Sequence, residues 1–227
     1  LVGVITVSLV VGCFLFYAFT MVDGTVDLNL NNPELNFTTT IYIDDGKGEF
    51  EEYKRLHGEF NRKWMDYNTV AIENKDPEYK GIPQMLADAF IAIEDKTCYK
   101  HHGFNRRRMF GAVLSRLTGR SASMSGTSTI TQQLARNVFL PEEKSVRSIK
   151  RKIIEMYYAH EIEEELSKEE ILTAYLNTIY LGYGCYGVDT AAKKYFGTEV
   201  EDLTLEECAA LASLPQAPGV YALLMTE

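Results

Sequence analysis

Residues 126–137 read GTSTITQQLARN and carry a high density of polar side chains. Hydroxyls, carboxamides and one guanidinium suit a ligand rich in hydroxyl groups and anionic oxygens, such as a sugar phosphate. The run has few apolar residues, so it lacks the stripe that a core helix would bury. A Ser/Thr-rich loop followed by a polar surface helix is the alternative. The surrounding residues favour the binding interpretation.

Two carboxylates, Glu94 and Glu155, are the candidate catalytic groups. Glu94 is followed by Asp95 at the expected end of a helix, where the helix dipole disfavours negative charge. A carboxylate beside apolar surface has a raised pKa and can act as a general base. The alternative is an ordinary solvated helix end, which is the simpler interpretation of an isolated Glu-Asp pair.

Cationic side chains gather in the stretch that leads to Glu155. Arg147, Arg151 and Glu155 follow one another at intervals of four, so they share one face of a helix. A surface ion pair between Arg151 and Glu155 is the alternative. Guanidinium groups bind phosphate oxygens in a bidentate way, so the cluster favours a diphosphate ligand. Carboxylates beside a diphosphate suggest glycosyl chemistry through an oxocarbenium-like transition state. The cations of this stretch are Arg136, Arg147, Lys150, Arg151 and Lys152.

The first residues, 1–22, contain no charged side chain. A bilayer is crossed by about 20 apolar residues, whereas a signal peptide has a shorter apolar region and a small-residue cleavage site. A buried core helix is the third alternative. We expect a single transmembrane anchor at 1–22, a linker at 23–40 and a catalytic domain at 41–227. The net charge of −9 argues against nonspecific nucleic-acid binding.

Hydrophobic periodicity predicts a mainly α-helical domain with a small β element. Alternating β-branched residues at 38–43 precede a glycine-containing turn and predict a strand. A helix is expected from Pro83 to the Glu94-Asp95 pair, with Met85, Leu86, Ala89, Phe90 and Ile93 on its apolar face. Further helices are expected at 106–117, at 146–166, from Ser167 to about Tyr180, and from Thr204 to a point before Pro215. Ser167 with Glu170, and Thr204 with Glu207, match the capping box.

The cysteines and histidines show no metal-site pattern. None of Cys13, Cys98, Cys185 and Cys208 belongs to a CxxC pair, and we expect the last three to be small apolar packing residues. Two adjacent histidines point in different directions, and no second ligand set follows them. We therefore expect His101 to have a structural or hydrogen-bonding role.

Five blocks, in order, resemble the peptidoglycan glycosyltransferase family (glycosyltransferase family 51), the domain of class A penicillin-binding proteins and of monofunctional cell-wall glycosyltransferases. The resemblance covers about Ile41 to Tyr221. The blocks are Glu94-Asp95 with Tyr99, His101 and Gly103; residues 126–137; Arg151-Lys152 with Glu155; residues 171–182, continuing through 186–197; and residues 209–215 with Pro218 and Tyr221.

The resemblance implies a lysozyme-like α-helical fold with a larger head and a smaller membrane-proximal jaw. It implies polymerisation of lipid II into β-1,4 glycan strands, with inversion and release of undecaprenyl diphosphate. Glu94 matches the general base that deprotonates the acceptor 4-hydroxyl. Glu155 matches a second carboxylate at the diphosphate or its metal.

The resemblance also assigns binding residues, cofactors and partners. Diphosphate-side positions are Arg136, Arg147, Arg151 and Lys152, and residues lining the cleft are Ser128, Gln132, Gln133 and Tyr180. It is compatible with a divalent cation, Mg²⁺ or Mn²⁺, which Glu155 would meet through the diphosphate; no organic cofactor is expected. It places a single-pass protein in the cell membrane with the catalytic domain on the extracytoplasmic face. Expected partners are lipid II, the growing strand, moenomycin-type phosphoglycolipid inhibitors, and other cell-wall synthesis and division proteins.

Some positions depart from the family pattern. Cys98 replaces Phe, Thr127 replaces Gly, Arg136 replaces Lys, Asn105 replaces Asp and Gly111 replaces Arg. Two other functions remain open at this point: a muramidase or lytic transglycosylase, and a catalytically silent scaffold. Since the chain has no Ser-x-x-Lys motif, we expect no transpeptidase activity from it.

Overall fold

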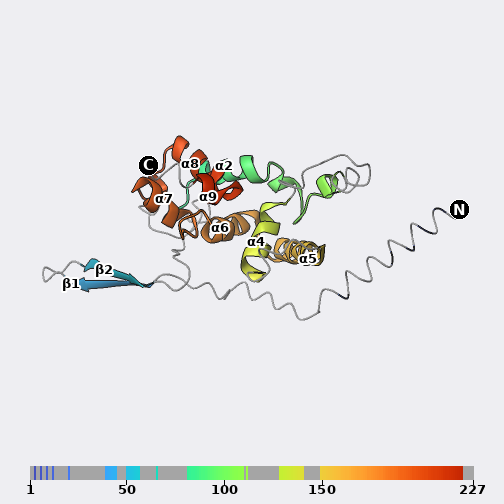
Figure 1. Cartoon of the computed structure of the whole chain (residues 1–227), viewed down its shortest axis with the longest axis horizontal. Helices are drawn as coiled ribbons and strands as arrows, with labels where there is room; N and C mark the ends of the chain where they lie inside the picture. The colour runs from blue at the N-terminus through green and yellow to red at the C-terminus, as the bar shows by residue number, and fades with distance from the viewer. Residues whose placement is uncertain are drawn as a thin grey trace.

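The computed structural model describes residues 39–44, 50–56, 65, 81–109, 111, 128–140 and 149–221, together with isolated positions 3, 6, 9, 12 and 20. This part of the chain is mainly helical (Figure 1). Among the described residues, no helix combines the length and the apolar character that crossing a bilayer requires. Most of the anchor predicted at 1–22 and of the linker at 23–40 lies outside the described residues, as do Arg147 and most of the helix predicted at 106–117.

The β element is a two-stranded antiparallel hairpin. Strand β1 (Thr39–Asp44) covers most of the segment in which alternation predicted a strand, and it pairs with β2 (Phe50–Leu56). The register shifts by one residue between Ile41, which pairs with Lys54, and Tyr42, which pairs with Glu52. An extra residue on one strand of a pair is a β-bulge, and it increases the local twist of the hairpin.

The helices follow in chain order after the hairpin. They are α2 (Gln84–Glu94), η2 (Cys98–Lys100), α4 (Ile130–Phe139), α5 (Ile149–Glu165), α6 (Lys168–Thr178), α7 (Val188–Phe196), η3 (Val200–Asp202), α8 (Leu205–Ser213), η4 (Leu214–Gln216) and α9 (Pro218–Tyr221). Helix α4 packs against both α5 and α6, and α2 packs against α8. Figure 1 shows α4 lying between α5 and α6.

One apolar core joins these helices. Phe90 of α2 meets Tyr175 of α6 edge to face, with ring centroids 6.0 Å apart, and both side chains are fully buried. Ile130 and Leu134 of α4 and Ile162 of α5 belong to the same core. Buried aromatic and aliphatic side chains of this size each stabilise a fold by about 1.5–3 kcal/mol.

Capping boxes start three of the helices. The two predicted boxes, Ser167 with Glu170 and Thr204 with Glu207, are confirmed at the starts of α6 and α8. A third box, Thr129 with Gln132, starts α4. In each box the side-chain oxygen accepts from the backbone N–H three residues later, which would otherwise lack a partner.

The apolar face predicted for α2 is partly wrong. Leu86 and Phe90 are fully buried as expected, but Ala87 is buried with them, whereas Met85 and Ile93 are 36% and 37% exposed. The packed face is set by the helix that covers it, here α8, and the small side chain of Ala87 permits close packing. The helix was predicted to begin at Pro83, but Pro83 occupies the N-cap position and α2 begins one residue later, at Gln84.

Asn177 of α6 fixes a distant backbone segment. Its side chain accepts a 2.7 Å hydrogen bond from Met65 N–H and donates one of 2.7 Å to Met65 C=O. The same carboxamide donates to Thr173 C=O within α6, at 2.8 Å. Met65 and Asn177 are 112 residues apart, so one buried side chain closes a long loop of the fold.

Candidate active site

Most of the polar run at 128–137 lies in α4, and the start of that helix is buried. Thr129, Thr131, Gln132 and Gln133 are all at most 7% exposed. The alternative interpretation as a polar surface helix is therefore wrong. Buried polar side chains persist where hydrogen bonds replace those of water, and neighbouring segments supply partners here. Helix α4 thus brings polar groups into the interior between α5 and α6.

Thr129 anchors the start of this helix. Its Oγ1 accepts from Gln132 N–H at 3.1 Å and donates to Gly103 C=O at 2.5 Å. Gly103 has φ +80°, and a Cβ there would lie 2.6 Å from Ala159 C=O on α5. Only glycine combines this backbone conformation with so close an approach. The loop at Gly103 is therefore held between α4 and α5.

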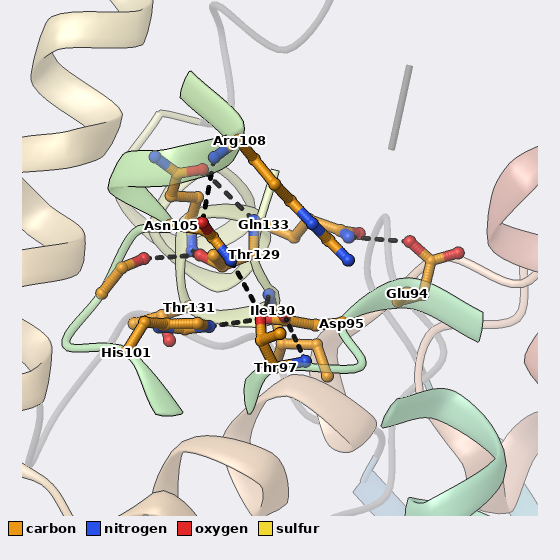
Figure 2. A network of polar contacts seen from close by, with 12 residues as sticks. Glu94, Asp95, Thr97, His101, Asn105, Arg108, Thr129, Ile130, Thr131 and Gln133 are labelled. Carbon is orange, nitrogen blue, oxygen red and sulfur yellow. Dashed lines mark hydrogen bonds and ion pairs between the residues drawn. The ribbon is translucent and has the colours of Figure 1, made fainter. Parts of the chain in front are cut away.

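Glu94, the last residue of α2, points toward the amide of Gln133 (Figure 2). Gln133 Nε2 donates to Glu94 Oε2 at 2.8 Å, while Gln133 Oε1 accepts from Tyr175 O–H at 3.2 Å. Burial raises the pKa of Glu94 above its ordinary value, although the hydrogen bond from Gln133 and the charge of Arg136 lower it. A carboxylate with a raised pKa has the property that a general base needs.

Asp95 has a different environment from its neighbour, and Figure 2 shows it surrounded by partners. Its side chain is fully buried. Asp95 Oδ2 lies 2.8 Å from His101 Nε2 and accepts a hydrogen bond from Ile130 N–H at 3.2 Å. Asp95 Oδ1 accepts a hydrogen bond from the backbone N–H of Thr97. Burial alone would raise the pKa of Asp95, but the hydrogen bond and charge of His101, with the other donors, hold it below its ordinary value. The hydrogen-bonding role predicted for His101 is confirmed.

Glu155 is buried among cations. Its Oε2 lies 3.0 Å from Lys152 Nζ, and its Oε1 lies 3.0 Å from Arg151 Nε and 3.8 Å from Arg136 Nη1. The side chains of Glu155 and Arg151 are 1% and 12% exposed, so the alternative of an exposed surface pair is wrong. A buried carboxylate surrounded by three cations keeps those cations in place for an anionic ligand.

Lys152 joins this cluster to the polar helix. Its Nζ donates to Ser128 Oγ at 3.0 Å and to Gln132 Oε1 at 3.2 Å, as well as to Glu155. Burial lowers the pKa of Lys152, although Glu155 opposes that shift. The described structure thus brings Ser128, Gln132, Lys152 and Glu155 together.

The two candidate carboxylates are connected through α4. Glu94 binds Gln133, and Glu155 is linked through Lys152 to Gln132. Arg136 of the same helix lowers the pKa of Glu94 and pairs with Glu155. One helix therefore carries contacts to both acids. That the two acids face each other across a cleft stays a prediction.

Two of the predicted binding residues, Tyr180 and Arg147, do not belong to the contacts described around Glu94 and Glu155. Tyr180 lies after α6, is 40% exposed, and forms an isolated bridge with Tyr186, their rings 4.9 Å apart. Its place in a cleft stays a prediction. Arg147 lies outside the described residues.

The described side chains do not form a metal site of their own. Among them, no group of three His, Cys, Asp or Glu residues is arranged to hold a metal ion. The oxygens of Glu155 contact cationic side chains instead. A divalent cation bound through a diphosphate stays a prediction.

The predicted packing role of the described cysteines is confirmed. Cys98, Cys185 and Cys208 are free thiols within the apolar core. Burial raises the pKa of Cys98 to about 12, so this thiol is held in its unreactive neutral form.

Two of these features were not predicted from the sequence. The capping box at Thr129 follows the Thr-x-x-Gln pattern, which would have predicted the start of α4. Asn105 was noted only as a departure from the family pattern. Its amide donates to Thr97 Oγ1 at 2.9 Å and its oxygen accepts from Arg108 N–H at 3.0 Å. An ionised aspartate could make only the second of these bonds.

Comparison with known proteins shows the family. The family model described as transglycosylase matches residues 61–227. The chain is 40% identical over 206 residues to penicillin-binding protein 1A of Clostridium botulinum, an alignment that covers 89% of the chain and 23% of that protein. It is 41% identical over 208 residues to penicillin-binding protein 1A of Vibrio cholerae, covering 91% and 22%, and 51% identical over 140 residues to that of Escherichia coli, covering 62% and 16%.

The chain thus spans less than a quarter of the length of these relatives. The match to the family model extends over all the blocks that carry the resemblance and over most of the chain. The resemblance stated from the sequence is therefore confirmed, and the chain belongs to the transglycosylase family, the peptidoglycan glycosyltransferases.

Proposed function

We propose that the chain polymerises lipid II into β-1,4 glycan strands as the glycosyltransferase part of a membrane-anchored protein. The observation that carries this proposal is the contrast between two acids, Glu94 of α2 and Glu155 of α5, that both contact helix α4. Glu94 has a raised pKa and a single carboxamide donor, whereas Glu155 is buried among three cations. The first environment suits a base, and the second suits the binding of a diphosphate.

The reaction is a single displacement with inversion. Glu94 takes the proton of the acceptor 4-hydroxyl as that oxygen attacks the anomeric carbon of the donor. The bond from that carbon to the diphosphate oxygen breaks, and undecaprenyl diphosphate leaves with the electron pair. Proton removal by a positioned carboxylate contributes about 10²–10⁴-fold to such a rate.

The cation cluster stabilises the charge on the leaving diphosphate. Arg136, Arg151 and Lys152 surround Glu155, which holds them in place in the absence of substrate. Preorganised donors of this kind stabilise developing charge without reorganisation during the reaction. Ser128 and Gln132 orient Lys152, and Gln133 orients Glu94. A divalent cation, if the diphosphate brings one, would add Lewis-acid stabilisation of the same oxygens.

The test is incubation of the membrane-embedded chain with lipid II and, separately, with purified cell-wall glycan. Growth of a polymer from lipid II supports the proposal. Fragments from the glycan without polymer from lipid II would establish a muramidase or lytic transglycosylase instead. Failure with both substrates would support a silent scaffold. Binding of a phosphoglycolipid inhibitor, lost on Lys152→Met, would support the diphosphate site.

A further inference from the structure

A second polar cluster joins α4, α5, α6 and the loop that carries His101. Its centre is Glu163 of α5, whose side chain is only 3% exposed. Glu163 Oε1 accepts a 2.6 Å hydrogen bond from Thr131 Oγ1 and another of 2.6 Å from Lys168 Nζ. The proposed reaction does not use this carboxylate, although burying a charge is costly unless partners compensate it.

Lys168 connects Glu163 to the loop before α4. The Lys168 ammonium lies 2.6 Å from Glu163 Oε2 and donates to His101 C=O at 2.9 Å. The His101 ring has Glu163 Oε1 4.0 Å from Nδ1 and Asp95 Oδ2 2.8 Å from Nε2. Two buried carboxylates therefore flank one imidazole.

These contacts fix the first turn of α4. Thr129 is held by Gly103 C=O, Ile130 N–H by Asp95, and Thr131 by Glu163. Figure 2 shows Asp95 joined by dashed contacts to the backbone N–H of Ile130 and to the ring of His101. Gln133 follows within the next turn, and its backbone N–H donates to Thr129 C=O at 3.0 Å. The amide of Gln133 reaches Glu94 from this anchored turn.

We infer that Glu163 is a positioning residue for the catalytic base. By holding Thr131 and Lys168, Glu163 fixes the first turn of α4. The fixed first turn then keeps Gln133 within hydrogen-bond distance of Glu94. The inference rests on the proposed function, since it takes Glu94 to be the base. An ion pair that served the fold alone would change stability without changing the chemistry of Glu94.

The first test compares Glu163→Gln with Glu164→Gln in the full chain acting on lipid II. Both variants remove one charge from the same end of α5, but the Glu164 side chain is 65% exposed. We expect Glu163→Gln to lower kcat by about 10–100-fold with little change in KM, because a small misplacement of reacting groups costs that much. Glu164→Gln should keep the wild-type rate.

The pH profile separates positioning from stability. The groups that act on the pKa of Glu94 are Gln133, Arg136 and Asp95, and the first of these lowers it by donating a hydrogen bond. If Glu163→Gln moves Gln133 away, the pKa of Glu94 rises. The acid limb of the profile, the pH range in which kcat falls as Glu94 becomes protonated, then moves to higher pH. A loss of folded protein would reduce the rate equally at every pH and leave the limb in place.

A double-mutant cycle tests the route through Thr131. Thr131→Val removes only the hydroxyl, whereas Thr131→Ser keeps it and should retain nearly wild-type turnover. If Glu163 acts through Thr131, combining Thr131→Val with Glu163→Gln lowers kcat by less than the product of the two single effects. Should Glu163→Gln fail to fold, Thr131→Val carries the kcat and pH measurements alone.

The outcomes separate the inference from the proposed function. A wild-type chain that makes no polymer from lipid II overturns both. The inference alone is overturned if the wild type is active and both Glu163→Gln and Thr131→Val keep its kcat and its acid limb. The inference is also overturned if the variants lose activity equally at every pH and this loss disappears once the rates are divided by the amount of folded enzyme. Binding of an inhibitor measures that amount.

Discussion

Gln133 Nε2 donates a hydrogen bond of 2.8 Å to Glu94 Oε2. The orientation of this amide is set from its other end, because Tyr175 O–H donates to Gln133 Oε1 at 3.2 Å. An amide donor holds the carboxylate in place without adding a full positive charge, so the partly buried acid keeps a raised pKa. The pair thus combines orientation with basicity.

Replacing Glu94 by Gln should abolish polymerisation. The change keeps the size of the side chain and removes the group that accepts the proton, which is expected to cost about 10²–10⁴-fold in rate. Polymer formation from lipid II measures the loss, and circular dichroism checks that the helices remain. Near-normal turnover by a folded Glu94→Gln protein would refute the assignment of the base.

The two neighbouring acids should have opposite effects on stability at neutral pH. The pKa of Glu94 is raised in the folded state, so its ionisation costs stability that Glu94→Gln restores above the ordinary pKa of 4.5. The pKa of Asp95 is lowered, so its ionisation contributes stability that is present above 3.8 and lost as pH falls through the folded pKa. Asp95→Asn should therefore destabilise the fold.

Denaturant unfolding of the two variants and the wild type at several pH values measures this contrast. The difference in unfolding free energy between each variant and the wild type should shrink in acid. For Glu94→Gln it should shrink once the pH is below 4.5, and for Asp95→Asn at lower pH. Changes of the same sign at pH 7 would contradict the assignment of separate roles to the two acids.

The acid limb of the activity profile should respond to Gln133. The hydrogen bond from Gln133 lowers the pKa of Glu94, so Gln133→Met should move the limb to higher pH. The variant keeps an unbranched side chain of similar length but donates no hydrogen bond. Initial rates of polymerisation across pH measure the shift, and a limb unchanged from wild type would show that Glu94 does not limit the rate in acid.

Lys152→Met should weaken binding of diphosphate-bearing ligands and also cost stability. The substitution removes a cation 3.0 Å from Glu155 Oε2 and leaves a buried carboxylate oxygen without that donor. Such a loss costs about 1–3 kcal/mol of unfolding free energy. Isothermal titration with a phosphoglycolipid inhibitor measures the binding.

Lys150→Met is the matched control, since Lys150 precedes Lys152 by two residues on the same helix and is exposed. It should leave both the affinity and the stability close to wild type. Equal losses in the two variants would mean that the effect comes from net charge and not from the buried cluster.

Gly103→Ala should destabilise the fold by about 1–3 kcal/mol. The new Cβ would lie 2.6 Å from Ala159 C=O at a residue whose φ is +80°. Gly111→Ala is the control: no atom lies within 4 Å of its added Cβ, so alanine should be neutral or stabilising there. Thermal unfolding measures both, and a Gly103→Ala protein as stable as wild type would contradict the described packing of this loop on α5.

Much of the fold could be predicted from local sequence. The boxes at Ser167 and Thr204 gave the starts of α6 and α8 because capping chemistry depends on residues three positions apart. The buried face of α2 was harder, because the choice between Met85 and Ala87 depends on the helix that packs there. The local sequence of α2 does not indicate which helix will pack against it.

In the candidate site, too, contacts within one helix could be predicted from the sequence, whereas contacts between distant segments could not. Charge density predicted that Arg151 and Lys152 belong with Glu155, because all three lie on one stretch of helix. The burial of α4 was left open, because polar residues are normally exposed. No local pattern marks Glu163, since its partners Thr131 and His101 are distant in sequence.

The clamp between Asn177 and Met65 has a consequence for folding kinetics. Its two 2.7 Å bonds join points 112 residues apart, so they form only after the chain has closed a large loop. Pairings at such separation raise the contact order, as the packing of α2 against α8 also does, and a higher contact order slows folding. We therefore expect the contacts of the Asn177 carboxamide to form late in folding, after α6 has begun to form.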